Sequence, residues 1–201
     1  MIALKKTEQL DLLLQQNNGI LKTSEAVALG VSKTYFGEYV RKRGLERVSQ
    51  GVYLSPDAWE DGMYLLQARF PQVIFSHETA LYLLGLAERE PLQYTVTVKS
   101  NLNASNISAQ GVKVYKVKQE LYPEGIAETL SPAGHTLRVY NAERSVCDII
   151  RSRSQIEMQD LQITLRAYVQ LREKNLPLLM RYAKDFRVEK ILKQYLEVLM
   201  P

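Results

Sequence analysis

Residues 22–54 have the sequence KTSEAVALGVSKTYFGEYVRKRGLERVSQGVYL, and this stretch decides the fold of the N-terminal part of the chain. Its pattern predicts a short helix, a tight turn, a second helix over about residues 33–43, and a β-hairpin made of residues 45–48 and 52–54. That order is typical of a winged helix-turn-helix, which presents one helix and one β-ribbon to a DNA duplex.

The residue types at the element boundaries support this interpretation. Thr23 and Ser24 are predicted to cap the first helix, because their hydroxyls can accept a hydrogen bond from an unpaired N–H at a helix start. Gly30 can adopt the positive φ that the tight turn needs. Ser32 is predicted to cap the second helix and Gly44 to end it.

The second helix is expected to bury one face and to expose the other. Phe36, Tyr39 and Val40 recur at helical spacing and are predicted to point inward. The N-terminal end of the helix is expected to meet base edges, since lysine can donate to guanine and threonine can contact the thymine methyl. Basic residues farther along and hairpin residues are expected to meet phosphates or the minor groove. The candidate DNA-binding residues are Thr23, Lys33, Thr34, Tyr35, Arg41, Lys42, Arg43, Arg47, Ser49 and Gln50.

A helical hairpin with a β-turn and no nucleic acid partner is the alternative for this stretch. The spacing Ala-x-x-x-Gly-Val-Ser from Ala26 to Ser32, the basic cluster at residues 41–43 and Arg47 in the hairpin favour DNA.

The overall composition is that of an ordinary soluble globular protein. The chain has 201 residues, of which 46% are hydrophobic and 24% charged, so one large or two small domains fit. Its single cysteine, Cys147, excludes an internal disulfide and suits a reducing compartment. The sequence contains no apolar run of membrane-spanning length and no signal-peptide pattern at its start. These features predict a cytoplasmic protein that does not bind membranes.

The net charge of +4 is unevenly distributed. Residues 1–55 carry +3, residues 56–90 carry −4 and residues 91–201 carry +5. The basic C-terminal part could extend a DNA-binding surface or bind an acidic partner, although most of its charges are expected to solvate helix faces.

The rest of the chain predicts an α+β fold. Residues 5–17 are predicted to form a helix, and Ile20 and Leu21 a short segment that pairs with the hairpin. Ser55-Pro56-Asp57 predicts the start of a connecting helix that runs to about Arg69. Strands are predicted at 73–75, 94–99, 112–117, 126–130 and 136–139. Helices are predicted at 77–84, 142–152, 154–173, 177–184 and from 188 onward. Ser76 is predicted to cap the first of these helices, Asn141 the second, and a capping box to open the third.

These elements predict three functional segments. Residues 1–55 are expected to be a winged helix-turn-helix DNA-binding domain, residues 56–85 connecting helices, and residues 86–201 an α+β domain with a small mixed sheet and C-terminal helices. The apolar stripe of the last helix is expected to pack on the preceding helices.

Three stretches, in order, resemble the AbiEi-type antitoxins of type IV (abortive infection) toxin–antitoxin systems. The segment GVSKTYFGEYVRKRGLERVSQGVYL at 30–54 is similar to the winged-helix segment of that family, including Gly51 and Tyr53 at the end of the wing. FSHETALYLLGL at 75–86 and NAERSVCD at 141–148 resemble two further family helices, with Ser145 where the family has threonine.

The resemblance implies a bifunctional protein, and the residues themselves predict no cofactor and no metal. Its N-terminal domain would bind inverted repeats in its own promoter and repress transcription. Its C-terminal domain, residues 86–201, would be an antitoxin domain that neutralises a nucleotidyltransferase-like toxin, without the need for a stable complex.

Other function classes remain as alternatives. The sequence has no phosphate-binding glycine motif, and one cysteine with two histidines cannot build a Cys/His zinc site. His77, one residue inside a predicted helix start, is expected to have a structural role, and His135 follows Gly134 in a turn. A restriction-like nuclease is disfavoured because Glu-x-Lys occurs nowhere in the chain. A plain winged-helix regulator with a C-terminal ligand- or protein-interaction domain remains the alternative. Glu143, Arg144 and Asp148 are the antitoxin candidates, with a structural ion-pair role as the competing interpretation.

Overall fold

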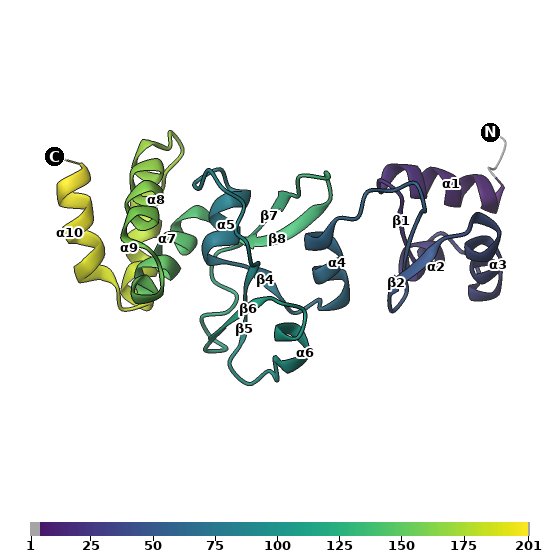
Figure 1. Cartoon of the computed structure of the whole chain (residues 1–201), viewed down its shortest axis with the longest axis horizontal. Coiled ribbons are helices and arrows are strands. Elements are labelled where there is room, and N and C mark those ends of the chain that lie inside the picture. Colours follow the sequence, from purple (N-terminus) through teal and green to yellow (C-terminus); the bar gives the residue numbers. More distant parts are fainter. Residues whose placement is uncertain (1–4, 201) are drawn as a thin grey trace. The chain divides into compact units, whose positions relative to one another are not determined.

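The computed structural model of the chain describes residues 5–200. The polypeptide divides into two compact units. Unit 1 comprises the chain up to Pro71 together with Leu130–Thr136, and unit 2 comprises Gln72–Thr129 and Leu137–Pro201 (Figure 1). The functional segments 1–55, 56–85 and 86–201 stay a prediction, because this division follows packing rather than activity.

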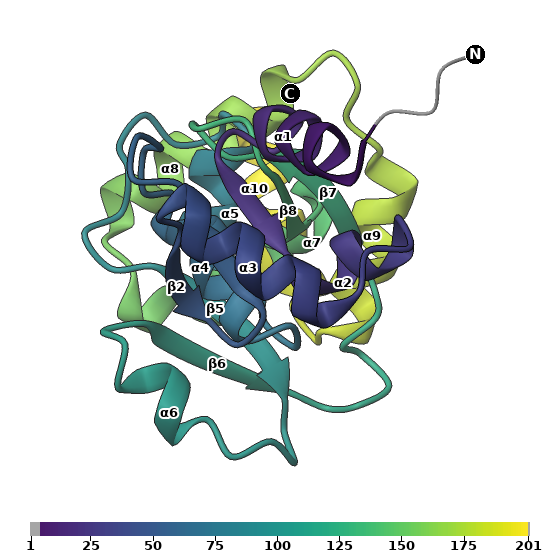
Figure 2. The ribbon, with the colours of Figure 1, turned by 90° about the vertical axis from the view of Figure 1, so that its right-hand side faces the viewer.

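Unit 1 is a winged helix-turn-helix. It contains α1 (Lys6–Gln16), β1 (Ile20–Lys22), α2 (Thr23–Ala28), α3 (Lys33–Arg43), β2 (Glu46–Ser49), β3 (Val52–Leu54) and α4 (Gly62–Arg69). The three strands form an antiparallel sheet in the order β1-β3-β2. Ile20 pairs with Leu54, which confirms the predicted pairing of residues 20–21 with the wing. Helices α2 and α3 lie side by side (Figures 1 and 2).

The capping residues of α3 are as predicted. Ser32 Oγ accepts a hydrogen bond from the Tyr35 N–H at 3.3 Å. Gly44 has a φ of +64° and follows the last helical residue, Arg43. The predicted caps of the preceding helix are wrong, because α2 already begins at Thr23. There the Glu25 carboxylate accepts from the Lys22 N–H at 3.3 Å, so an acid in the first turn takes the place of a hydroxyl cap.

The predicted helix start at Ser55 is also wrong. Helix α4 begins seven residues later, where Asp61 Oδ1 accepts from the Tyr64 N–H at 3.0 Å. Ser55 closes a turn instead, through its carbonyl and the Ala58 N–H. Trp59 is 88% exposed, so a helix through this residue would bury no continuous apolar stripe.

Unit 2 is built around a mixed five-stranded sheet. It contains β4 (Ile74–Phe75), β5 (Thr95–Lys99), β6 (Lys113–Val117), β7 (Ile126–Leu130) and β8 (Thr136–Tyr140), in the order β6-β5-β4-β8-β7. Strand β4 is central, antiparallel to β5 and parallel to β8, while β5 and β6 are parallel. The short helix α6 (Ser105–Ser108) lies beside β6 (Figure 2).

Helices form the rest of unit 2. They are α5 (His77–Leu83), α7 (Ala142–Arg151), α8 (Met158–Gln170), α9 (Leu176–Asp185) and α10 (Glu189–Leu199). The last three pack with α7 (Figure 1). In α10, Leu192 is fully buried, and its neighbours on the stripe pack against the same core, which confirms the predicted packing of the last helix.

Two further capping predictions have opposite outcomes. Asn141 caps α7, because its Oδ1 accepts from the Arg144 N–H at 2.9 Å. The capping box predicted at 154–157 is wrong, since Arg153–Gln155 forms a 3₁₀ turn and α8 begins only at Met158, without a side-chain cap.

The predicted α+β class, a winged helix-turn-helix followed by a mixed sheet and C-terminal helices, is confirmed. Within residues 5–200, no helix has the length and apolarity needed to cross a membrane.

Candidate DNA interface

Helix α3 presents a basic face to solvent because its opposite face is held in the core of unit 1. Phe36 and Tyr39 are buried in that core. The Phe36 ring also contacts Tyr53 of β3 edge-on, with 5.3 Å between centroids, which connects the helix to the wing. Opposite these residues, Lys33, Thr34, Arg41 and Lys42 are exposed. Lys33, Arg41 and Lys42 take part in none of the ion pairs among the described residues, so their positive charges remain available to DNA phosphates.

Two other candidates on α3 already have partners in unit 1. The Tyr35 hydroxyl lies 2.6 Å from Thr7 Oγ1, and its ring is half-buried. The Arg43 guanidinium donates to Asp11 on α1, and this carboxylate raises the pKa of Arg43. The Tyr39 hydroxyl also donates to Asp11, at 2.6 Å, and burial and this bond raise the pKa of Tyr39. Arg43 and Tyr35 therefore connect α3 to α1.

The wing residues differ in exposure. Arg47 and Gln50 are exposed, while Ser49 and Thr23 are half-buried. Arg47 Nε donates to the Ser49 carbonyl at 3.3 Å, next to a register irregularity in the β2–β3 pairing. The Thr23 N–H donates to the Gly51 carbonyl at 2.8 Å, so the start of α2 is bonded to the wing turn. The structure thus brings the candidates together on α3, the wing and the start of α2.

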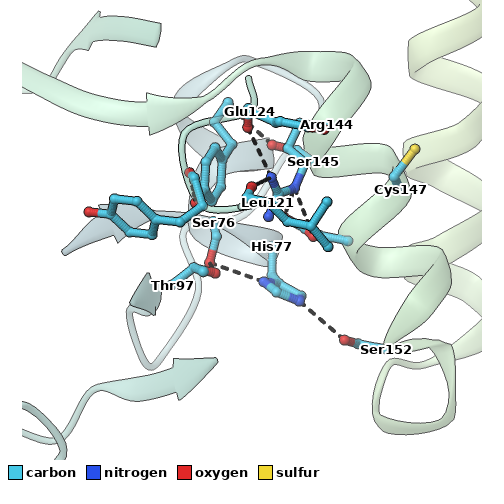
Figure 3. A network of polar contacts seen from close by, with 12 residues as sticks. Ser76, His77, Thr97, Leu121, Glu124, Arg144, Ser145, Cys147 and Ser152 are labelled. Carbon is cyan, nitrogen blue, oxygen red and sulfur yellow. Dashed lines mark hydrogen bonds and ion pairs between the residues drawn. The ribbon is translucent and has the colours of Figure 1, made fainter. Parts of the chain in front are cut away.

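The antitoxin candidates Glu143, Arg144 and Asp148 are buried in unit 2, and Figure 3 shows Arg144 among its contacts. The Arg144 side chain is buried, and its Nε donates to both carboxylate oxygens of Asp148 at 3.1 Å. Its Nη1 donates to the carbonyls of Leu121 and Glu124 at 2.8 and 2.9 Å. Arg144 therefore joins α7 to the segment that precedes β7.

Aromatic rings and further hydrogen bonds complete this cluster. The Arg144 guanidinium lies 4.1 Å from the Tyr140 ring centroid and 3.9 Å from that of Phe186. Burial raises the pKa of the Asp148 carboxyl, and the charge of Arg144 opposes this shift. Glu143, also buried, accepts from the Tyr168 hydroxyl at 3.1 Å and from the Asn175 N–H at 2.9 Å. This geometry is that of an internal network which holds α7 against its neighbours.

His77 is part of a second buried polar group in unit 2. Its Nδ1 lies 3.0 Å from Ser76 Oγ and its Nε2 3.1 Å from Ser152 Oγ (Figure 3). Its ring stacks on Tyr115 with centroids 3.5 Å apart. Burial, and then the nearby charge of Arg144, lower the pKa of His77 well below its usual value. Ser76 occupies the N-cap position of α5 as predicted, but its hydroxyl bonds Thr97 and His77 instead of a helix N–H.

His135 belongs to a polar group in unit 1 that sequence reasoning missed. Its Nδ1 lies 2.8 Å from Asp61 Oδ2, to which Ser131 Oγ donates at 2.5 Å. Its Nε2 lies 3.1 Å from the Asn17 carbonyl oxygen. The serine and the histidine therefore share one carboxylate, which is not the arrangement in which a histidine activates a serine nucleophile. No local signal could have revealed this group, because Asp61 lies 70 and 74 residues from Ser131 and His135 along the chain.

The described residues contain no group of three or more His, Cys, Asp or Glu placed to hold a metal ion. The thiol of Cys147 is buried, and burial raises its pKa. A buried neutral thiol is a poor nucleophile.

Comparison with known proteins identifies the N-terminal part of the chain. Residues 6–90 match a family model described as "Transcriptional regulator, AbiEi antitoxin N-terminal domain". This match confirms the resemblance to AbiEi-type antitoxins for the stretches at 30–54 and 75–86, while the stretch at 141–148 lies outside the matched residues. The match covers the helix-turn-helix, the wing, α4, β4 and α5. It supports a DNA-binding antitoxin and transcriptional regulator, and the description names no enzymatic activity.

A solved structure extends the similarity in fold to most of the chain. The crystal structure of the RV2827C protein from Mycobacterium tuberculosis matches with a TM-score of 0.55 and 14% sequence identity. The match covers 90% of this chain and 72% of that protein. At this identity the match shows a shared fold. The chain matches no curated protein.

Proposed function

We propose that this protein is a bifunctional, type IV antitoxin that represses its own promoter. Unit 1 binds inverted repeats through α3 and the wing, and the C-terminal part neutralises a nucleotidyltransferase-like toxin, with or without a stable complex. The observation that carries the DNA-binding half is the exposed basic face of α3, inside a segment that matches the AbiEi regulator model.

The burial of the α3 side chains supports specific roles. Lys33 and Thr34 follow the capped helix start and are exposed, as base-reading residues of a recognition helix must be. Arg41 and Lys42 are exposed at the other end and suit phosphate contacts. Arg43 is bonded to Asp11 and Tyr35 to Thr7, so their part in DNA binding is to hold α3 in place.

The first test is promoter binding by an Arg41→Ala, Lys42→Ala variant. We expect weaker binding to every sequence, and a salt dependence whose slope falls by about 2, one for each phosphate contact. The matched control is Lys184→Ala with Lys190→Ala, which removes two exposed charges from α9 and α10. An unchanged slope in the first variant would remove these residues from the interface.

The antitoxin half is tested by co-expression with a nucleotidyltransferase-like toxin encoded beside this protein. We expect the full-length chain to restore growth. A folded chain that represses its promoter but gives no rescue would leave the alternative of a plain winged-helix regulator.

A further inference from the structure

An open groove lies in unit 1. Its volume is about 890 Å³, within the range typical of ligand sites. Its lining comes from α1, the loop between β3 and α4, and the turn before β8, all within unit 1. We call it the Trp59 groove; the residues that line it are Asp11, Leu14, Gln15, Asn18, Gly19, Ser55, Asp57, Ala58, Trp59, Glu60, Pro132, Ala133 and His135.

Trp59 is the feature of this groove that folding does not explain. It is the only tryptophan in the chain, and its side chain is 88% exposed. An exposed tryptophan beside a groove is typical of a binding surface, because this side chain supplies large contact energies once a partner buries it. Leu14, Ala58 and Pro132 add apolar area around it.

The charge of the groove indicates what kind of partner fits. Three carboxylates line it, on Asp11, Asp57 and Glu60, and its lining includes no lysine or arginine. Asp57 and Glu60 are exposed. DNA phosphates would be repelled here, so the groove is not a continuation of the DNA interface.

The protein itself contains an example of cation binding at this site. Asp11, one of the lining residues, binds the guanidinium of Arg43. A second cation beside Asp57 and Glu60 would have two carboxylates for its charge and the face of Trp59 for a cation–π contact. Acidic groups next to apolar surface complement a segment that alternates cationic and apolar side chains.

We propose that the Trp59 groove binds a short segment of a partner protein in which a lysine or arginine stands next to an apolar side chain. The cation is held by Asp57 and Glu60, and the apolar side chain packs on Trp59. This assignment is independent of how α3 contacts DNA.

Trp59 makes the proposal directly measurable, because the intrinsic tryptophan fluorescence of the full-length protein comes from this side chain alone. The probe is a blocked hexapeptide of alternating lysine and leucine, compared with one that has glutamate in place of lysine. We expect a saturable blue shift with the lysine peptide and none with the glutamate peptide.

Two variants of equal charge separate the groove from general electrostatics. Asp57→Asn with Glu60→Gln should weaken binding of the lysine peptide at least tenfold. Glu88→Gln with Glu128→Gln, which neutralises two exposed acids outside the groove, should leave its affinity within twofold.

Several outcomes would overturn the proposal. These are the absence of a saturable shift, equal weakening in both variants, or a blue shift that grows with protein concentration when no peptide is present. The last outcome would assign the groove to a second copy of this chain. Promoter binding is measured on the same variants, so a failure here is distinguishable from a failure of the DNA-binding function.

Discussion

Two arginines in this chain show how surroundings decide what one residue type does. Arg41 on α3 is exposed and forms no ion pair with the described residues, so its charge is available to a polyanion. Arg144 is fully buried, and a carboxylate, two carbonyls and two aromatic rings surround its guanidinium. We propose the first as part of the DNA interface, whereas the second is part of the core of unit 2.

Removal of Arg144 is expected to destabilise unit 2 strongly. An Arg144→Met variant leaves the buried Asp148 carboxylate and two carbonyls without a donor, which costs about 3–5 kcal/mol of unfolding free energy. Urea unfolding measures this loss. In the double variant Arg144→Met, Asp148→Leu the unpaired charge is gone, and part of the stability should return. A stable Arg144→Met protein that no longer neutralises the toxin would instead support a direct antitoxin role.

His77 is expected to make the protein less stable in mild acid. Its pKa is lowered in the folded protein, so the unfolded chain binds the proton more readily below its ordinary pKa of about 6.5. The contribution of His77 is therefore fully present above pH 6.5 and is lost as the pH falls, by up to about 1.4 kcal/mol per pH unit.

The measurement is the unfolding free energy between pH 7.5 and 5.5, for the wild type and for His77→Asn. Asparagine tolerates the φ of +50° at this position and does not titrate. The variant should show a smaller decrease on acidification, and parallel curves for the two proteins would contradict the assignment.

At the scale of elements, the two ends of α3 are specified by different means. Ser32 accepts the bond that starts the helix, and Gly44 ends it with a left-handed residue. Between them, Gly37 is exposed, and a Cβ built on it would meet no atom within 4 Å. The C-cap of α3 therefore requires a glycine, at Gly44, whereas the helix itself does not need the one at Gly37.

Alanine substitutions at these two glycines should have opposite effects. Gly37→Ala should stabilise the protein by about 1 kcal/mol, because alanine has the higher helix propensity. Gly44→Ala should destabilise it by about 1 kcal/mol, because its φ of +64° strains an alanine. Thermal unfolding of both variants measures the difference, and effects of the same sign would contradict this account.

At the scale of the whole molecule, the units do not coincide with the segments expected from the sequence. Strand β4 is the centre of the sheet in unit 2, and α5 follows it directly. A fragment of residues 86–201 would lack both elements. The separation of functions is therefore better tested with substitutions in the full-length chain.

We expect the Arg41→Ala, Lys42→Ala variant to lose repression while it still neutralises the toxin. The two activities are measured in one strain, with a reporter fused to the promoter and with growth under toxin expression. Loss of both activities in a protein with an unchanged unfolding transition would contradict separable functions.

The sequence predicted those features whose cause is local. The caps Ser32 and Asn141, the end of α3 at Gly44 and the strands of the wing all depend on residues a few positions apart. The helix starts proposed at Ser55 and in the segment 154–157 failed, and Ser76 stands at the predicted N-cap but uses its hydroxyl for tertiary contacts. Asp61 starts α4 instead of Ser55, and the Ser76 hydroxyl bonds Thr97 on the neighbouring strand.

The same limit applies to the candidate sites. The exposed basic residues of α3 follow from helical periodicity and could be named in advance. The partners of Arg43 and Tyr35 lie on α1, 32 and 28 residues away, and could not. The group of Asp61, Ser131 and His135 and the exposed groove beside Trp59 likewise depend on segments that only folding brings together.

The length of α3 limits how much sequence information one molecule can read. Eleven residues at about 1.5 Å each make a helix of about 16 Å, which spans roughly five base pairs at about 3.4 Å each. A given five-base-pair sequence recurs about once per thousand base pairs. That is too often for selective binding among the roughly million or more competing sites in a genome. Two such five-base-pair sequences at a fixed spacing recur together about once per million base pairs. Selective repression by this helix therefore requires two copies on one operator.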